Sequence, residues 1–291
     1  MTINGETAEN TFGPRPESSN IRLGGIETVR FTETSSPKLA HEAWRLHATS
    51  YMDRHFITED AIADDGTLKP EIDHARGKYV QYYISSESEG LSSPEASPRK
   101  ATLRKIYIPP GGGLDALPAY RLCIDSLYDE EKELLQAIQN PQKHVQEIGA
   151  LAQSEHRSHV ASFGAMRQVL QDSFGKNETW LFSIVESTYA VLVRSFGPMA
   201  IRRVGSLVGL EDEGVSEQVQ LVPVILEVDK FLQNIYDSAL QEDTTQKFRR
   251  QFGSLIFFSE GMPDSKLPDD VALALAPFSN NNITRKDPYT A

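Results

Sequence analysis

The stretch Val145-Gln-Glu-Ile-Gly-Ala-Leu-Ala152 is an apolar run interrupted by a carboxylate and a glycine, a composition that predicts a strand inside a sheet. A helical pattern follows over residues 161–174 and ends at Gly175, a residue typical of helix C-termini. A second strand-like run, residues 179–185, comes next. The order strand, helix, strand predicts that this segment forms the middle of a mixed sheet covered by helices.

The chain before this segment predicts three more strands and two helices. Alternating or apolar runs predict the strands, at residues 26–33, 79–84 and 101–108. Pro37 suits the first turn of a helix. The apolar residues of that helix fall at spacings of three and four and form one stripe: Ala40, Trp44, Ala48 and Tyr51. A shorter helix is predicted as an insertion over residues 129–139.

The chain after this segment continues the alternation of helices and strands. A helix is predicted from Ser187 to Phe196, closed by Gly197 and Pro198. The remaining predicted elements are strands at 200–204 and 221–226 and helices at 228–240 and 246–252. The whole order favours one mixed α/β (α+β) sheet flanked by helices, with a helical C-terminal extension, over a sandwich or a helical bundle.

The composition indicates a globular protein with one main domain. Of the 291 residues, 39% are hydrophobic, enough for a single large core with appendages. We expect a disordered tail at 1–22, a main domain at 23–242, and a helical extension and tail at 243–291. No apolar run approaches the roughly 18 residues of a membrane helix, and the N-terminus lacks a signal pattern. We therefore expect a soluble, cytoplasmic protein without integral membrane association.

Charge and residue usage exclude several classes of site. The chain has 29 Lys and Arg against 41 Asp and Glu, and this net charge of −12 argues against a nucleic-acid partner. The single cysteine, Cys123, excludes an intrachain disulfide. His156 and His159 have no evident third ligand, so we expect no metal site. A serine hydrolase is disfavoured because no Gly-x-Ser-x-Gly motif occurs.

The element order resembles the GNAT acyltransferase fold, in particular the branch of acyl-homoserine lactone synthases and long-chain N-acyl amino acid synthases. The following motifs carry this resemblance across residues 26–240: Trp44-Arg45 with Tyr51, Glu71-Ile-Asp73, Arg104, Leu114 to Pro118 followed by Glu147 to Ala152, and Val191 to Gly197. The resemblance implies a mostly antiparallel sheet and an acyltransferase that moves an acyl group from a thioester to an amine such as an amino acid. It also implies acyl-CoA or an acyl carrier protein as co-substrate, with no permanently bound cofactor.

Two departures from this branch leave alternatives open. Ala150 stands where the lactone synthases carry an arginine, although an acyl-homoserine lactone synthase remains an alternative. The segment that would bind the pyrophosphate of coenzyme A retains only Arg157 and the pair Gly164-Ala165. This erosion favours either a carrier protein as the donor or a second alternative, a catalytically inactive GNAT-like module that binds an acyl ligand or a protein partner.

Acyl transfer to an amine requires a base, because the nitrogen must lose a proton before it attacks. Glu147, on the predicted central strand, is our candidate base, and Tyr189 is a candidate general acid. The resemblance implies a substrate site formed by Trp44, Arg45, Glu71, Asp73 and Arg104. We expect the thioester to lie along Gly149, Ala150, Leu151 and Ala152, near Arg157, where the strand parts from its neighbour.

Overall fold

A computed structural model gives the fold of the chain. The structure describes residues 21–23, 26–70, 72–73, 76–77, 79–87, 99–138, 144–154, 159–173, 176–196, 201–209 and 220–240. Several sequence predictions lie outside these residues: the tail up to residue 20, Glu71, Arg157, the helix at 246–252 and the extension at 243–291.

One sheet forms the centre of the described structure, with strand order β1-β2-β3-β4-β5-β6-β9-β7 and β8 also paired with β9. The strands are β1 (Ile21–Leu23), β2 (Ile26–Thr32), β3 (Val80–Glu87), β4 (Arg99–Tyr107), β5 (His144–Gln153), β6 (Glu178–Val185), β7 (Arg202–Arg203), β8 (Val208–Gly209) and β9 (Gln220–Glu227). Among these strands, β5 and β6 pair in parallel and the other pairs are antiparallel. The predicted mixed, mostly antiparallel sheet is confirmed.

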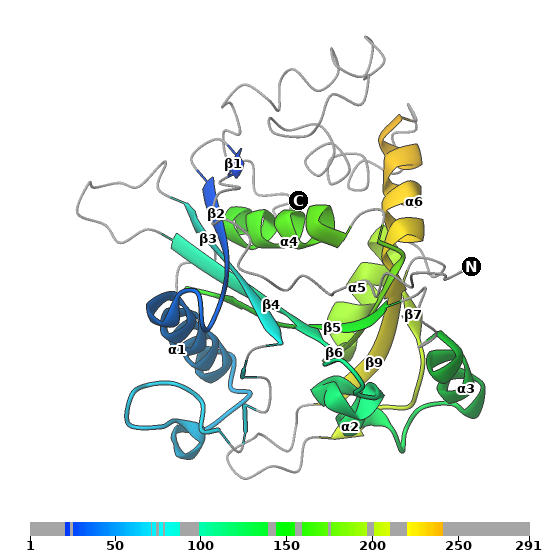
Figure 1. Cartoon of the computed structure of the whole chain (residues 1–291), viewed down its shortest axis with the longest axis horizontal. Coiled ribbons are helices and arrows are strands. Elements are labelled where there is room, and N and C mark those ends of the chain that lie inside the picture. The colour runs from blue at the N-terminus through cyan, green and yellow to red at the C-terminus, as the bar shows by residue number, and fades with distance from the viewer. Residues whose placement is uncertain are drawn as a thin grey trace, which may run out of the picture.

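Helices cover both faces of the sheet, with α1 and α4 on opposite sides of β3, β4 and β5 (Figure 1). The helices are α1 (Pro37–Asp53), α2 (Pro118–Cys123), α3 (Asp129–Ile138), α4 (His159–Ser173), α5 (Glu186–Phe196) and α6 (Val228–Leu240). Two 3-10 turns, Glu59–Ala61 and Leu114–Ala116, lie in the connections. All of these α-helices except the six-residue α2 were predicted from the sequence.

The two faces of the sheet belong to two hydrophobic clusters, because successive residues of a strand point to opposite sides. On β3 and β4, Tyr82 and Ile106 pack in the cluster that contains residues of α1 and α2. On the opposite side of the same strands, Tyr83 and Leu103 pack in the cluster that contains residues of α4 and α6. We refer to these sides as the α1 face and the α4 face.

Strands β5 and β6 part in the middle of the sheet. Their paired residues run from His144 with Glu178 to Glu147 with Leu181, whereas β5 continues to Gln153. Strand β6 also continues past its last pair with β5, while it stays paired with β9. The two described strands therefore have no paired residues beyond Glu147 and Leu181, and the predicted parting of the strands is confirmed. We refer to the interval between them, which begins beside Gly149, as the slot.

A β-bulge lies in β5 at the same level. In the ladder with β4, Thr102 pairs with Ala152 and Arg104 pairs with Gly149, so one residue of β4 opposes residues 150–151. A bulge of this kind leaves the extra residue out of the ladder and bends the strand. The bulge thus turns the backbone of β5 away from regular pairing where the slot opens.

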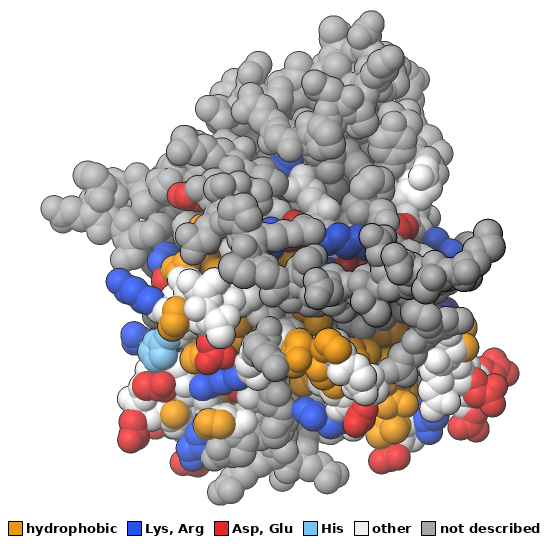
Figure 2. All heavy atoms as spheres, in the orientation of Figure 1, with side chains coloured by type: hydrophobic (Ala, Val, Ile, Leu, Met, Phe, Trp, Pro, Cys, Tyr) orange, Lys and Arg blue, Asp and Glu red, His pale blue; other side chains and the backbone are white. Residues whose placement is uncertain are grey.

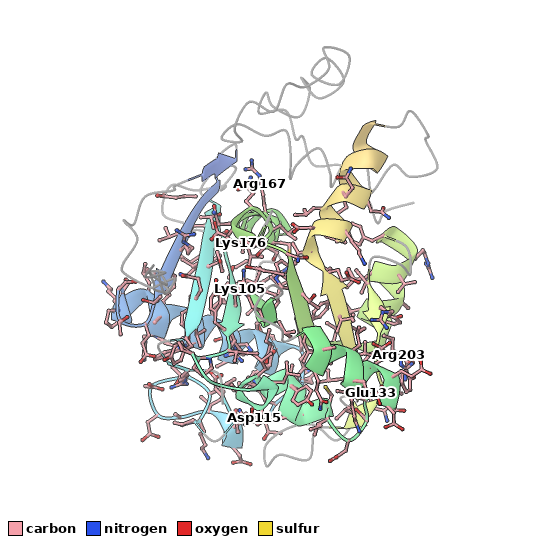
Figure 3. All side chains as sticks on the ribbon, turned by 45° about the vertical axis from the view of Figure 1, so that its right-hand side comes forward. Lys105, Asp115, Glu133, Arg167, Lys176 and Arg203 are labelled. Carbon is pink, nitrogen blue, oxygen red and sulfur yellow. The ribbon has the colours of Figure 1, made fainter. Side chains whose placement is uncertain are left out.

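A buried ion pair lies on the α4 face. Lys105 of β4 is fully buried, and its Nζ donates hydrogen bonds to Glu178 Oε2 at 2.5 Å and to Ser173 Oγ at 2.7 Å. The indole N–H of Trp180 donates to the same oxygen of Glu178 at 3.2 Å. Figure 3 shows Lys105 in the interior of the molecule. The group is closed to solvent, which indicates a structural role.

The described surface is acidic around α3, where Figure 2 shows carboxylate side chains grouped at the right edge. Helix α3 begins with three acidic residues, Asp129, Glu130 and Glu131. Negative side chains in the first turn of a helix are favourable because they face the positive end of the helix dipole. Among the described residues, no helix has the length and apolar character needed to cross a membrane.

Candidate active site

Glu147 lies on the α1 face of β5, at the last residue pair before the slot. It is only 6% exposed, and its Oε2 accepts a hydrogen bond of 2.7 Å from the backbone N–H of Ala119 in the first turn of α2. Burial raises the pKa of Glu147 to about 7, although the bond from Ala119 and the charge of Arg104 oppose this rise. A carboxyl group that titrates near neutral pH is suited to accept and release a proton.

Arg104 lies opposite, on β4, in a charged cluster with Asp73 and Arg76. Its Nη1 donates to Asp73 Oδ1 at 2.5 Å, and Arg76 Nε donates to the other oxygen of Asp73 at 3.3 Å. Burial raises the pKa of Asp73, but the positive charges beside it outweigh burial and hold this pKa well below its ordinary value. The aspartate is therefore ionised, and it fixes both guanidinium groups.

Gly149 separates Glu147 from Arg104. A Cβ atom on Gly149 would lie 3.5 Å from Glu147 Oε1 and 3.8 Å from Arg104 Nε. The missing side chain thus leaves a space whose two sides are a carboxylate oxygen and a guanidinium nitrogen.

An aromatic wall closes the site on the α1 side. The indole N–H of Trp44 donates a hydrogen bond of 2.9 Å to Tyr82 Oη, and the guanidinium carbon of Arg76 lies 4.4 Å from the centre of the Trp44 ring. Trp44, Tyr82 and Arg104 line one small pocket together with Ala43, His47 and Thr102. This wall is preorganised, because each aromatic ring is held by a hydrogen bond or a cation–π contact.

The structure brings together four of the residues predicted for the site and places two others elsewhere on the described elements. Trp44, Asp73, Arg104 and Glu147 form one group. Arg45, by contrast, is exposed on α1, and its guanidinium lies beside Gly66. Tyr189 on α5 packs on the α4 face, against the same hydrophobic cluster as Leu151 and Ile184. Glu71 and Arg157 lie outside the described residues.

The predicted thioester segment lies along the slot. Gly149 pairs with β4, Ala152 is buried, and Leu151 between them is half-buried. Ala150 belongs to the same strand. Leu151 contributes to an apolar group on the α4 face that also contains half-buried Phe182 and Ile184 of β6. Apolar side chains from both strands therefore flank the opening.

Sequence reasoning missed three contributors to the site: His47, Tyr82 and Ala119. His47 precedes Tyr51 by four residues and so shares its face of α1, which was an available signal. Ala119 contributes a backbone N–H from a helix too short to show a period. In the described part of the chain, no group of three or more His, Cys, Asp and Glu side chains is placed to hold a metal ion.

Comparison with known proteins gives the fold a name. No family model and no curated protein matches the sequence. Among solved structures, FeeM, an N-acyl amino acid synthase from uncultured soil microbes, is similar at 13% identity, with 77% of this chain and 98% of FeeM covered and a TM-score of 0.50. The chain has the GNAT fold. The CoA-dependent acyl-homoserine lactone synthase MesI is also similar, at 12% identity, with 74% and 96% covered and a TM-score of 0.43. The GNAT fold confirms the predicted fold class.

Proposed function

We propose that this protein is an N-acyltransferase that moves an acyl group from a thioester to the amine of a small acceptor such as an amino acid. The observation that carries the proposal is the buried Glu147, which faces Arg104 across Gly149 at the mouth of the slot. The donor is acyl-CoA or an acyl carrier protein. FeeM, which has the same fold, is an N-acyl amino acid synthase, and this supports the reaction class.

Glu147 acts as the general base in this proposal. The acceptor enters as an ammonium ion, and its proton passes to the carboxylate of Glu147, which titrates near neutrality. The ion pair of Arg104 with Asp73 holds the guanidinium in place, so that it can bind the acceptor's carboxylate. The neutral nitrogen is then free to attack.

The slot positions the thioester. The acyl chain lies against the apolar side chains of Leu151, Phe182 and Ile184, and the thioester carbonyl lies beside the bulge of β5. Backbone N–H groups beyond the last β5–β6 pair stabilise the oxyanion that forms when nitrogen attacks. The intermediate then collapses: the new C–N bond remains, the C–S bond breaks, and the departing thiolate takes up the second proton of the nitrogen. Glu147 releases the first proton to solvent.

The proposal is tested with the purified full chain and two sets of donors. Coenzyme A thioesters from acetyl to hexadecanoyl, and the same acyl groups on a carrier protein, are each incubated with amino acids and with polyamines. We expect thiol release that depends on the acceptor, and an N-acyl product of matching mass. If no donor and acceptor pair releases thiol above the level of a heat-denatured control, the proposal is wrong. A fatty acid or acyl thioester found by native mass spectrometry in such an inert protein would instead support the non-catalytic module.

Arg104→Ala is expected to raise the KM for the acceptor about 10–100-fold, because a charge-assisted hydrogen bond is lost, and to leave the KM for the donor nearly unchanged. Asp73 keeps Arg76 as an ion-pair partner in this variant. Steady-state kinetics with each substrate varied in turn measure the split, and thermal unfolding reports the fold. An effect confined to the donor would move Arg104 to the thioester side of the site.

Gly149→Ala is expected to lower kcat/KM about 10–100-fold, because its methyl group would occupy the space between Glu147 and Arg104 and displace the acceptor. The nearest atoms lie at ordinary van der Waals distance, so the fold should be retained. The exposed Gly209, where a Cβ would meet no atom within 4 Å, supplies the matched control Gly209→Ala. Equal activity of both variants would contradict the proposed position of the acceptor.

A further inference from the structure

Two buried nitrogen atoms of the candidate active site have no hydrogen-bond partner among the described residues: His47 Nε2 and Arg104 Nε. Both residues line the same small pocket, beside Trp44 and Tyr82. A buried polar atom without a partner costs about 1–3 kcal/mol. Buried polar groups are almost always bonded to protein, ordered water or a ligand, so two such atoms on one pocket mark a position where a ligand group can accept or donate both bonds.

His47 is held in a fixed position on α1. His47 is 4% exposed, and its ring packs edge-on against the ring of Tyr51, with 4.1 Å between the ring centres. Burial, together with the positive charge of Arg104, lowers the pKa of His47 to about 3. His47 is therefore neutral at physiological pH, and one of its ring nitrogens donates a hydrogen bond while the other accepts.

The charges around the pocket define which ligand group fits. Arg104 Nε always carries a hydrogen, so its partner must be an acceptor. Arg104 and Arg76 share the single carboxylate of Asp73, which leaves positive charge in excess within this cluster. Glu147, across Gly149, is only partly ionised at neutral pH because its pKa lies at about 7. A carboxylate accepts from both nitrogens and neutralises the excess charge.

We propose that His47 is a specificity-determining residue of this site: its Nε2–H donates a hydrogen bond to the carboxylate of the acceptor, which also accepts from Arg104 Nε. The inference rests on the proposed acyltransferase function and deepens it. The acceptors are then amines that carry a carboxylate on the neighbouring carbon, and the corresponding amides are rejected. With the carboxylate at His47 and Arg104, the amine extends over Gly149 towards Glu147.

The experiment measures binding in the absence of any acyl donor. Isothermal titration calorimetry compares each of the twenty common amino acids with its primary amide on the wild-type chain. The amino acid that binds most tightly, together with its amide, is then titrated into three variants. His47→Phe removes both nitrogens and keeps an aromatic ring against Tyr51, while His47→Gln keeps an N–H donor near the position of Nε2. His41→Gln is the matched control, since His41 lies on the same helix with its side chain 42% exposed.

We expect the wild type to bind the acid at least about 10-fold more tightly than the amide, as a charged hydrogen bond requires. His47→Phe should weaken binding of the acid about 10–100-fold and leave binding of the amide unchanged. His47→Gln should retain the preference for the acid, and His41→Gln should match the wild type. The inference is overturned if the wild type shows no preference for any acid, or if His47→Phe weakens acid and amide equally or neither.

The outcome separates this inference from the proposed function. A chain that transfers no acyl group but shows a His47-dependent preference for the acid contradicts the function and leaves the carboxylate site intact. Conversely, the chain could transfer acyl groups while His47→Phe leaves the KM for the acceptor unchanged. That result supports the function and removes His47 from the site.

Discussion

Glu147→Gln is expected to lower the turnover number about 10²–10⁴-fold, because the amide cannot take the proton from the acceptor's ammonium group. The fold should remain intact, since the side-chain oxygen of glutamine can still accept the hydrogen bond from Ala119 N–H. Single-turnover measurements of thiol release, with saturating donor and acceptor, give the rate of the chemical step. Unchanged turnover would remove Glu147 from the role of base.

The pH dependence provides a second measurement on the same residue. In the wild type, kcat/KM should fall as pH drops below about 7, since protonated Glu147 is no longer a base. Stability has the opposite trend. The pKa of Glu147 is raised on folding from its ordinary value of 4.5, so the folded state binds more protons, and this residue's contribution is lost as pH rises from 4.5 towards 7. Glu147→Gln should abolish this loss of stability between pH 5 and 8. A substitution elsewhere that only inactivates the protein would leave the loss in place.

Lys105→Met is expected to destabilise the fold by about 3–5 kcal/mol, because it leaves the buried carboxylate of Glu178 without its counter-charge. Lys105 is fully buried and Glu178 is 3% exposed, so water cannot replace the lost partner. Urea unfolding monitored by circular dichroism measures the change in the free energy of unfolding. A loss below about 1 kcal/mol would show that solvent or another cation reaches Glu178.

The double variant Lys105→Met, Glu178→Gln tests whether charge is the cause. Glutamine keeps an acceptor for the indole N–H of Trp180 and removes the negative charge. We expect the double variant to be more stable than Lys105→Met alone, since a neutral pair in a buried site is often tolerated. Equal stability of the two variants would attribute the effect to packing around Lys105, and the double-mutant cycle gives the coupling energy directly.

The fold was predictable because its signals are local. The stripe on α1 and the apolar run of β5 each depend on residues close in sequence, and both elements form where the pattern placed them. The parting of β5 from β6 was also expected, from the resemblance to the GNAT fold and not from a local pattern. Helix α2 was missed because six residues are fewer than two turns, too few to establish a helical period.

The site was predictable only in part, because its contacts join residues far apart in the chain. Glu147 and Arg104 were predicted as single residues on two strands. The backbone N–H that donates to Glu147, however, belongs to a residue 28 positions earlier in the chain. Lys105 has the pattern of an outward-facing polar residue in an alternating strand, and its partner Glu178 lies 73 residues away. No local pattern specifies such a pair. Arg45 is the converse case: it is next to Trp44 in the sequence but lies on the exposed side of the same helix.

The slot between β5 and β6 also bears on whether these two strands can pair with a strand of another molecule. Unpaired strand edges are templates for another chain and therefore a common origin of aggregation. Here the unpaired edges lie inside the sheet, with α1 and α4 packed on opposite sides of β5, so an incoming strand from a second molecule finds no open approach along β5. In this arrangement a small ligand can reach the unpaired backbone groups of β5, whereas a strand of another molecule cannot pair with them.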